Sequence, residues 1–320
     1  MEIVLQIILL VVGFVLLIKG ADWFVDGASS TASNFKVPKS LIGLTIVAFG
    51  TSAPEFAVSI KALAGGQTDM VLGNVIGSNI LNILLILGIA AVIRPLHIRK
   101  ETIRKEIPIC ILISSLLVVL FLDSKLNSAT TNEISRSDGM AILLFFAVFL
   151  YYLVSLVMHS RDKKVKDEKP RWKLGKSLLI TLVGLAGIVL GSNMVVDSAT
   201  ALAMAIGITE RVIALTVIAF GTSLPELVTT IIAAKKGETE LAIGNILGSN
   251  IFNICVVLGI PVAIFGSVAP TSFAVYDLVA LIGSAALLFM FSVTNHKIKR
   301  WEGALMLVLF GVYYTLVFIA

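Results

Sequence analysis

Long apolar stretches follow one another along this chain, and short clusters of Gly, Pro and charged residues separate them. Apolar runs of about 18 residues or more predict membrane-spanning helices, whereas the strands of a membrane barrel would give a weaker, alternating pattern. The pattern therefore predicts an all-α integral membrane protein with ten transmembrane helices. The approximate limits of these spans are 3–32, 39–64, 68–93, 106–123, 139–159, 174–204, 211–234, 239–266, 273–293 and 302–319.

Two polar motifs interrupt the apolar pattern, and each of them occurs twice. Residues 44–55, LTIVAFGTSAPE, match residues 215–226, LTVIAFGTSLPE, at 9 of 12 positions. Residues 73–83, GNVIGSNILNI, match residues 244–254, GNILGSNIFNI, at 8 of 11 positions. Both pairs are offset by 171 residues, with no gap between them. One offset shared by two motifs predicts that the chain arose by internal duplication.

The duplication divides the predicted spans equally between two halves. Five spans in each half is an odd number, so the second half has to enter the membrane from the opposite side, as in the inverted repeats of many secondary transporters. We therefore expect residues 1–159 to form a first five-helix repeat and residues 174–320 to form a second, inverted one. Residues 160–173 are expected to be a basic cytoplasmic linker.

Composition and charge support a membrane protein and predict its orientation. The 320 residues are 58% hydrophobic and 14% charged, with a mean hydropathy of +1.00, too apolar for a soluble domain of this length. Loops on one predicted side, with adjacent residues, carry 20 Lys or Arg, and the opposite loops carry four. Because basic loops stay in the cytoplasm, both termini are expected on the other side. The net charge of +5 then reflects the basic loops that set the orientation in the membrane. The expected partner is therefore the lipid bilayer, not nucleic acid.

Each copy of the first motif is predicted to break its helix beside a carboxylate. Pro54 and Pro225 have no N–H to donate, so spans 2 and 7 should be broken helices, unwound at 48–54 and at the matching place in the second half. Lipid cannot satisfy the backbone carbonyls freed there. Glu55 and Glu226 follow the two prolines, and an intramembrane carboxylate costs roughly several kcal/mol. Two such groups in register predict a cation.

Hydroxyls and amides complete a polar set in which every donor is oxygen. Hydroxyls lie at both breaks, on Thr51, Ser52, Thr222 and Ser223. Polar stripes spaced by four follow on the third and eighth spans, formed by Asn74, Ser78 and Asn82 and by Asn245, Ser249 and Asn253. Flexible oxygen cages suit Ca²⁺ and the similarly sized Na⁺, whereas Mg²⁺ fits less well and soft metals would need His or Cys. Asn79 and Asn250 point away from the stripes and are expected to bond neighbouring helices.

Each of these features also has a simpler interpretation. A single Pro often only kinks a membrane helix, and a single Ser–Asn stripe often only packs helices, but both occur twice with Glu in register. An intramembrane hydrolase using Ser52 or Ser223 is disfavoured, because no His lies beside those serines. A passive channel remains a rival, although inverted halves favour alternating access. Asp277 lies inside the ninth span, and we find no acid that matches it in the first half.

At these motifs the sequence resembles the calcium/cation antiporter superfamily, in particular sodium/calcium exchangers of the bacterial or archaeal type. The two repeats of that family carry a G-T-S-x-P-E element followed by a G-S-N-x-x-N element, here GTSAPE with GSNILN and GTSLPE with GSNIFN. The resemblance covers about residues 20–90 and 191–261 closely. It implies a secondary active antiporter, not an enzyme, in the plasma (inner) membrane of a prokaryote. Such a protein exchanges Na⁺ for Ca²⁺ by alternating access and needs no cofactor.

The same resemblance implies one central cluster for the transported ions Ca²⁺ and Na⁺. Glu55 and Glu226 would be its shared carboxylates. The other implied ligands are Thr51, Thr222, Ser52, Ser223, Ser78, Ser249, Asn82 and Asn253, with the carbonyls of Ala48 and Ala219. In the family, the first and sixth spans slide against the remaining bundle. Asn253 stands where potassium-dependent relatives carry Asp, which argues against K⁺ co-transport, yet a proton- or potassium-linked antiporter stays open as the alternative. The sequence fixes no oligomeric state and is compatible with a monomer.

Overall fold

Helices account for nearly all of the structure. The computed structural model describes residues 2–122, 132–160, 169–207, 219–269 and 275–319. Two short strands, β1 (Leu96–His97) and β2 (Lys297–Ile298), pair antiparallel and join the two halves at one edge.

The helical segments of the first half follow the predicted spans closely; π-helical segments carry the symbol η. In chain order they are α1 (Glu2–Phe35), α2 (Lys39–Ile42), η1 (Gly43–Val47), α3 (Ala48–Thr51), α4 (Ala53–Ala64), α5 (Thr68–Leu81), η2 (Asn82–Leu87), α6 (Gly88–Ile93), η3 (Thr102–Glu106), α7 (Ile107–Phe121) and α9 (Arg136–Ser160).

The second half repeats this order of elements where it is described. Its helical segments are α10 (Leu174–Ala205), α12 (Ala219–Thr222), α13 (Leu224–Lys236), α14 (Thr239–Phe252), η5 (Asn253–Leu258), α15 (Gly259–Phe265), α16 (Val275–Asn295) and α17 (Arg300–Ile319). Helices joined through π-helical segments continue one another, so that α5–η2–α6 and α14–η5–α15 each form one long span.

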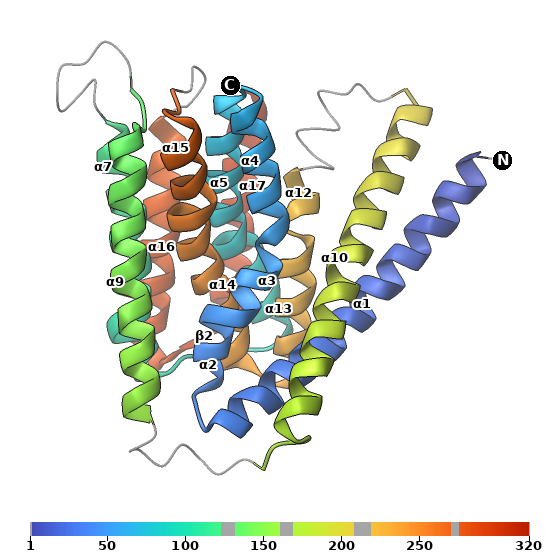
Figure 1. Cartoon of the computed structure of the whole chain (residues 1–320), viewed down its shortest axis with the longest axis vertical. Coiled ribbons are helices and arrows are strands. Elements are labelled where there is room, and N and C mark those ends of the chain that lie inside the picture. Colours follow the sequence, from blue (N-terminus) through green and yellow to red (C-terminus); the bar gives the residue numbers. More distant parts are fainter. Residues whose placement is uncertain (1, 123–131, 161–168, 208–218, 270–274, 320) are drawn as a thin grey trace.

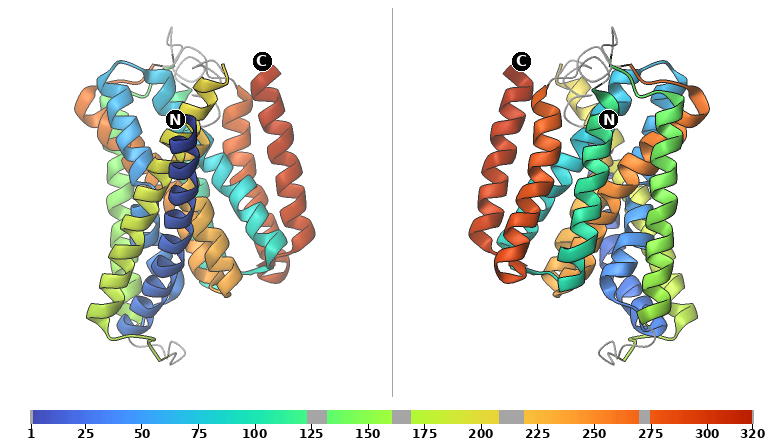
Figure 2. Two further views of the ribbon diagram at one scale, coloured as in Figure 1. Left: turned by 90° about the vertical axis from the view of Figure 1, so that its right-hand side faces the viewer. Right: turned by 90° about the vertical axis from the view of Figure 1, so that its left-hand side faces the viewer.

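The fold is that of a multi-pass membrane protein. Within the described residues, six helices are long and apolar enough to cross a bilayer, and the bent pair α2–α3 and α4 would add a seventh. The six cover Ile3–Phe35, Thr68–Ile93, Arg136–Met158, Leu174–Ala205, Thr239–Phe265 and Tyr276–Thr294. Figures 1 and 2 show α1 and α10 side by side on one flank of the bundle, with α1 clearly inclined to the long axis in Figure 1.

Glycines allow α1 and α10 to touch through their backbones. A Cβ added to Gly20 would lie 2.7 Å from the carbonyl carbon of Gly187, and one added to Gly191 would lie 2.5 Å from the amide nitrogen of Leu17. Gly20 and Gly191 occupy the same place in the two halves, 171 residues apart. Small residues permit this close approach in membrane helix pairs. In each half, therefore, the glycine at this position packs against the backbone of the long helix of the other half.

Two helices run through the middle of the bundle and are mostly buried. They are α5–η2–α6 in the first half and α14–η5–α15 in the second. Each becomes π-helical at an asparagine, Asn82 in one and Asn253 in the other, at the offset of the duplication. π-helical turns inside α-helices frequently mark functional sites, because the extra residue per turn redirects side chains.

The break in the second span is shorter than the sequence predicts. Ser52 (φ −86°, ψ 8°) separates α3 from α4, and the helix axes on its two sides differ by 46°. The amide of Ser52 still donates to the carbonyl of Ala48 at 3.0 Å, so the expected unwinding over residues 48–54 is wrong and this carbonyl is not freed. A bend of one residue is enough, because Pro54 removes a single donor from the helix.

The seventh span is interrupted at the matching residue, with nearly the same backbone dihedrals. Ser223 (φ −88°, ψ 5°) separates α12 from α13, and Pro225 lies in the first turn of α13, as Pro54 does in α4. Residues 208–218, which contain the first part of this predicted span, lie outside the described residues. The described part of each broken span therefore has one local geometry in both halves.

Asp277 does have a counterpart in the first half, which the sequence comparison missed. Glu106 precedes it by the same 171 residues. Each acid accepts a hydrogen bond from a tyrosine on the next long helix. The hydroxyl of Tyr152 donates to Glu106 Oε1 at 3.4 Å, and that of Tyr313 donates to Asp277 Oδ1 at 2.9 Å. These pairs tie η3 to α9 and α16 to α17.

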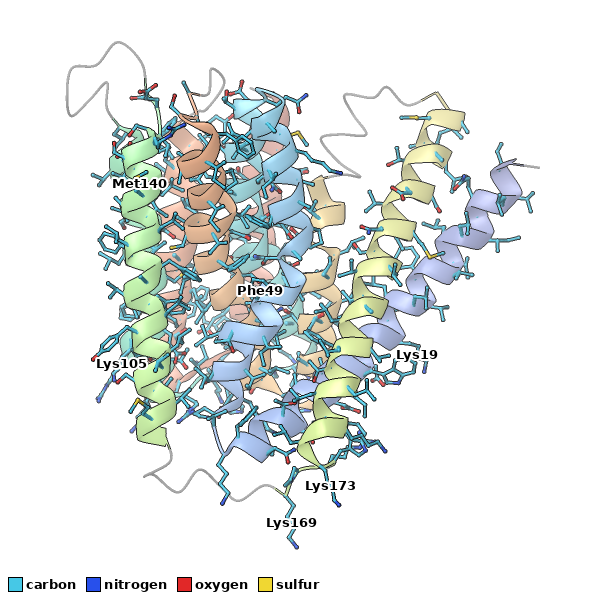
Figure 3. All side chains as sticks on the ribbon, viewed as in Figure 1. Lys19, Phe49, Lys105, Met140, Lys169 and Lys173 are labelled. Atoms are coloured by element: carbon cyan, nitrogen blue, oxygen red, sulfur yellow. The ribbon has the colours of Figure 1, made fainter. Side chains whose placement is uncertain are left out.

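The two ends of the molecule differ in charge. Both termini lie at the upper end in Figure 1, and Lys169 and Lys173 lie at the lower end in Figure 3. Near the lower end of α1, Lys236 Nζ forms ion pairs of 2.8 Å with Asp22 and 2.6 Å with Asp26. Of the expected linker, residues 161–168 lie outside the described residues.

Candidate cation site

The two bends place one carboxylate each inside the bundle. Glu55 lies in the first turn of α4 and Glu226 in the first turn of α13, with 1% and 0% of their surface exposed. A proline in a first turn is tolerated, because the amides there have no partner within the helix. The sequence-predicted pairing of proline and glutamate is thus found in the structure, at both copies of the motif.

Each carboxylate is held by a serine from the other half. Ser52 Oγ donates to Glu226 Oε1 at 2.8 Å, and Ser223 Oγ donates to Glu55 Oε1 at 3.2 Å. Glu226 Oε1 also accepts a hydrogen bond of 3.3 Å from Ser249 Oγ of α14. The bonds from Ser52 and Ser223 cross between the two halves, so the two glutamates belong to one cluster and not to two separate ones.

Four buried oxygens of this cluster have no hydrogen-bond partner among the described residues. They are Glu55 Oε2, Glu226 Oε2, Asn82 Oδ1 and Asn253 Oδ1. An unpaired buried acceptor costs about 1–3 kcal/mol, and a charged one costs more. All four are acceptors and belong to two residue pairs related by the duplication. A hard cation is the partner that would satisfy them together.

The remaining sequence-predicted residues lie around this cluster in different ways. Ser78 Oγ is 3.4 Å from Ser223 Oγ, and Thr51, fully buried, donates to Asn245 Oδ1 at 3.2 Å. The carbonyl of Ala48 is buried and accepts the helical bond described above. Thr222 and Ala219 are the last and first residues of α12, directly before Ser223.

Further amides brace the helices that carry the cluster. Asn74 Nδ2 donates to Ser59 Oγ at 2.9 Å, and Asn245 Nδ2 donates to Thr230 Oγ1 at 3.0 Å, again at positions related by the duplication. These bonds join α5 to α4 and α14 to α13. The polar stripes predicted from the spacing of four therefore contain both bracing residues and residues of the cluster.

Asn79 and Asn250 bond neighbouring helices, as predicted, but they also contact the cluster, which the sequence did not reveal. Asn82 Nδ2 donates to Asn250 Oδ1 at 2.9 Å, and Asn253 Nδ2 donates to Asn79 Oδ1 at 3.3 Å. The repeated Gly-Ser-Asn triplet was a signal for them. Their position off the stripe hid this role, because partners on a second helix cannot be read from one helix alone.

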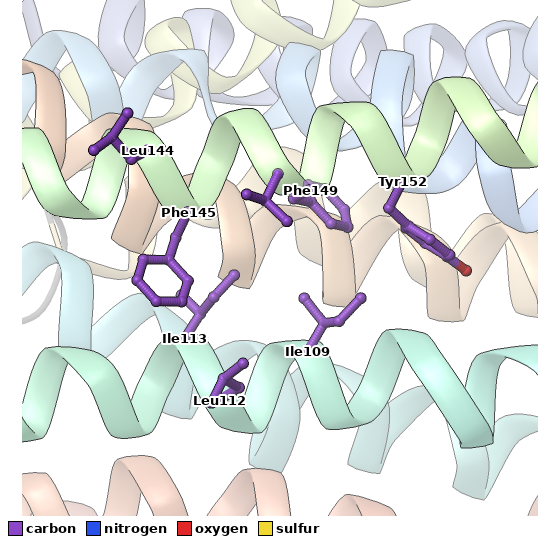
Figure 4. A pocket seen from close by; sticks show the side chains of 8 residues that line it. Ile109, Leu112, Ile113, Leu144, Phe145, Phe149 and Tyr152 are labelled. Atoms are coloured by element: carbon purple, nitrogen blue, oxygen red, sulfur yellow. The ribbon is translucent and has the colours of Figure 1, made fainter.

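A separate hollow between α7 and α9 takes no part in this chemistry. It has a volume of about 250 Å³ and is shown in Figure 4. The side chains around it are Ile109, Leu112, Ile113, Leu144, Phe145, Val148, Phe149 and Tyr152. Seven of these eight are hydrocarbon side chains, which offer no ligands to an ion.

A bundle of membrane-spanning helices around a buried cluster of oxygen donors has the arrangement of an ion transporter. Comparison with known proteins agrees with this class. The family model described as sodium/calcium exchanger protein matches the chain twice, at residues 5–155 and 176–319. This protein therefore belongs to the sodium/calcium exchanger family. The matching family model and the matching solved structures are of exchangers and not of enzymes, so the hydrolase considered above is set aside.

Relatives match over nearly the whole chain. The putative antiporter CaxA of Alkalimonas amylolytica is 38% identical, covering 97% of this chain and 98% of its own. The sodium/calcium exchanger MaX1 of Methanosarcina acetivorans is 32% identical, covering 99% of both. Among solved structures, the sodium–calcium exchanger NCX_Mj, soaked with Na⁺ in the absence of Ca²⁺, superposes with a TM-score of 0.85 at 32% identity, over 98% of this chain and 99% of that one. The membrane fold is therefore shared with a known exchanger.

Proposed function

We propose that this protein is a secondary active antiporter that exchanges Na⁺ for Ca²⁺ across the membrane by alternating access. The observation that carries the proposal is the set of four partnerless oxygens on Glu55, Glu226, Asn82 and Asn253. Carboxylate and amide oxygens are the ligands that Ca²⁺ prefers, and Na⁺ binds similar donors at broken membrane helices. The relative named a sodium/calcium exchanger and the solved exchanger support the same pair of ions.

The proposed binding site is one shared cluster formed by both halves. Glu55 and Glu226 supply the charge that a divalent cation balances. The other proposed ligands are Thr51, Thr222, Ser52, Ser223, Ser78, Ser249, Asn82 and Asn253, with the carbonyls of Ala48 and Ala219. The carbonyl of Ala48 already accepts the helical bond from Ser52 and lies 3.4 Å from Thr51 Oγ1, so it would coordinate an ion only as an additional acceptor contact.

Exchange follows from competition for these oxygens. One Ca²⁺ neutralises both glutamates, and Na⁺ ions bound to overlapping oxygens neutralise them too, so each ion excludes the other. An empty site would keep two unbalanced charges in a low-dielectric interior, which makes its movement across the membrane unfavourable. If only loaded states change their access, transport of one ion requires return transport of the other.

The proposed architecture is ten spans in two inverted five-helix repeats. Residues 1–159 and 174–320 would be the repeats and 160–173 the linker between them. The double match of one family model, the π-helical segments that begin at Asn82 and Asn253, and the matched bends at Ser52 and Ser223 support it. An odd number of spans per repeat then inverts the second repeat.

We further propose that both termini lie outside the cytoplasm of a prokaryotic cell, in whose inner membrane the protein resides. The two termini share one end of the molecule, and the linker lysines lie at the other (Figures 1 and 3). Because basic segments are retained in the cytoplasm, the lower end in these views is the cytoplasmic one. A monomer suffices for this arrangement, since both halves of the cluster come from one chain.

Uptake of radioactive Ca²⁺ into proteoliposomes tests the proposal. Purified protein is reconstituted with Na⁺ inside and diluted into choline medium, and uptake is expected to follow the outward Na⁺ gradient. Replacing that gradient by a K⁺ or proton gradient separates Na⁺ coupling from the potassium- or proton-linked alternative. Uptake that ignores the Na⁺ gradient but follows one of the others would reject Na⁺ coupling. Single-channel currents would instead indicate a pore.

A further inference from the structure

Asn79 and Asn250 form a reciprocal link between the two central helices. Asn79 Nδ2 donates to the carbonyl of Asn250 at 3.2 Å, and Asn250 Nδ2 donates to the carbonyl of Asn79 at 3.2 Å. Both side chains are fully buried, and the residues are 171 apart. Because each amide nitrogen is engaged with a backbone carbonyl, each Oδ1 is fixed on the opposite side of its amide group as an acceptor.

Those two fixed acceptors each receive the amide of a residue in the cation cluster. Asn82 Nδ2 donates to Asn250 Oδ1 at 2.9 Å, and Asn253 Nδ2 donates to Asn79 Oδ1 at 3.3 Å. With their nitrogens held in this way, the Oδ1 atoms of Asn82 and Asn253 point away from the link. These are the two amide oxygens that have no protein partner.

The orientation of an asparagine amide decides whether it attracts or repels a cation. The oxygen carries partial negative charge and coordinates, whereas the NH₂ group carries two partially positive hydrogens. The two ends have nearly the same size, so packing alone scarcely distinguishes the two orientations of Asn82 or Asn253. A hydrogen bond to a fixed acceptor does distinguish the two orientations, because it requires the NH₂ group to face that acceptor. Residues that hydrogen-bond to metal ligands orient those ligands in the same way.

We propose that Asn250 and Asn79 are positioning residues that orient the amides of Asn82 and Asn253, respectively, with oxygen toward the transported cation. The proposal rests on the proposed function, since it needs a cation in the cluster. Each positioning residue acts on the other half of the chain. Asn250 of the second half orients Asn82 of the first, and Asn79 of the first half orients Asn253 of the second. Helix packing and ligand orientation are thus carried by different atoms of the same side chains.

A double-mutant cycle separates orientation from packing. The probe is Ca²⁺ alone, titrated onto purified full-length protein in detergent without Na⁺, so that binding is read independently of transport. Asn250→Ala is expected to raise the Kd for Ca²⁺ by about 10–100-fold, the usual effect of losing an outer partner of a ligand. In an Asn82→Asp background the same substitution should change the Kd by less than about 3-fold, because a carboxylate presents oxygen in either orientation.

The crossed geometry supplies a matched control. Asn253→Asp should relieve the effect of Asn79→Ala but leave the effect of Asn250→Ala intact, and Asn82→Asp should do the reverse. A purely structural role would give Asn250→Ala the same effect in all three backgrounds, and that result would overturn the proposal. Wild-type protein that binds no Ca²⁺ would instead reject the proposed function itself, so the two failures are distinguishable.

A second variant keeps the test decisive if the alanine variants do not fold. Asn250→Asp loses the donor to the carbonyl of Asn79 but keeps an acceptor for Asn82 Nδ2. It should therefore lower the unfolding temperature, through the lost inter-helix bond, while the Kd for Ca²⁺ rises by less than about 3-fold. A loss of affinity as large as the 10–100-fold expected for the alanine variant would contradict orientation by the Oδ1 acceptor.

Discussion

Ser52 and Glu226 are joined by a 2.8 Å hydrogen bond although 174 residues separate them and each belongs to a different copy of the repeat. Ser223 and Glu55 form the reciprocal bond at 3.2 Å. Each carboxylate accepts one of its hydrogen bonds from a serine of the other half. The duplication therefore produces one site with two contributors, which explains why both copies of the motif retain serine and glutamate in this chain.

Replacing either glutamate by its amide is expected to abolish exchange. Glu55→Gln and Glu226→Gln each remove one of the two charges that balance Ca²⁺, and removing one partner from a buried charge pair costs about 3–5 kcal/mol. Na⁺-driven Ca²⁺ uptake in proteoliposomes should then fall by at least ~100-fold, since 1.4 kcal/mol is about tenfold. Glu106→Gln is the matched control, because Glu106 is a buried carboxyl that bonds Tyr152 away from the cluster. Normal uptake by either cluster variant would contradict the shared site.

The serine donors should matter most when no ion is bound. Ser52→Ala removes the 2.8 Å bond to Glu226, and a hydrogen bond to a charged group contributes about 1.5–3 kcal/mol. We expect a lower unfolding temperature in ion-free buffer and a smaller difference from wild type at saturating Ca²⁺, because the cation then satisfies the carboxylate. Thermal unfolding in detergent, with and without Ca²⁺, measures both.

The control for that experiment is Ser292→Ala. Ser292 is buried, and the bond described for its Oγ goes to the carbonyl of Leu288 within its own helix, at 2.6 Å. Its effect should not depend on Ca²⁺. A Ca²⁺-independent effect of Ser52→Ala, equal to that of Ser292→Ala, would mean that the Ser52 hydroxyl does not act through the carboxylate.

The sequence predicted the residues of the cluster better than the way in which they connect. The position of Glu55 next to Pro54 is a local property, so the motif alone located it. The bond from Ser52 to Glu226 is tertiary, and no spacing within one helix could indicate it. The break was predicted too long for a physical reason: proline removes one donor, and the amide of Ser52 continues the helical pattern to Ala48.

Two other features were missed because their signal is not in identical residues. Glu106 and Asp277 are different acids with unlike neighbours, so they are recognised only through the offset of 171 and their shared tyrosine partners. The glycines of α1 and α10 are visible in the sequence, but their role depends on which helices meet. Which helices pack together depends on the tertiary packing of the whole bundle, and the sequence of a single helix does not reveal it.

Adding a methyl group between α1 and α10 is expected to destabilise the protein. Gly191→Ala would place a Cβ 2.5 Å from the amide nitrogen of Leu17, and Gly20→Ala would place one 2.7 Å from the carbonyl carbon of Gly187. Backbone atoms cannot move aside as a flexible side chain can, so overpacking should cost about 1–3 kcal/mol. Thermal unfolding in detergent would show the loss.

Gly175→Ala provides the comparison on the same helix. Apart from its chain neighbours and the backbone of its own helix, no described atom lies within 4 Å of a Cβ added there. The substitution should therefore be neutral or slightly stabilising, since alanine favours a helix over glycine by roughly 0.5–1 kcal/mol. Equal unfolding temperatures for Gly191→Ala and Gly175→Ala would show that α1 and α10 do not touch at Gly191.

The two acid–tyrosine pairs should contribute unequally to stability, in the order of their distances. Tyr313→Phe removes a 2.9 Å bond to Asp277 that ties α16 to α17, whereas Tyr152→Phe removes a longer, weaker bond of 3.4 Å to Glu106. The unfolding free energy should fall by about 1 kcal/mol or more for Tyr313→Phe and by less for Tyr152→Phe. Tyr151→Phe is the control, because Tyr151 is 76% exposed on the outer face of α9 and should tolerate the change. If Tyr152→Phe proved the more damaging of the two, the hydroxyl of Tyr152 would have to bond Glu106 more closely than 3.4 Å, and the two halves would differ in the opposite sense.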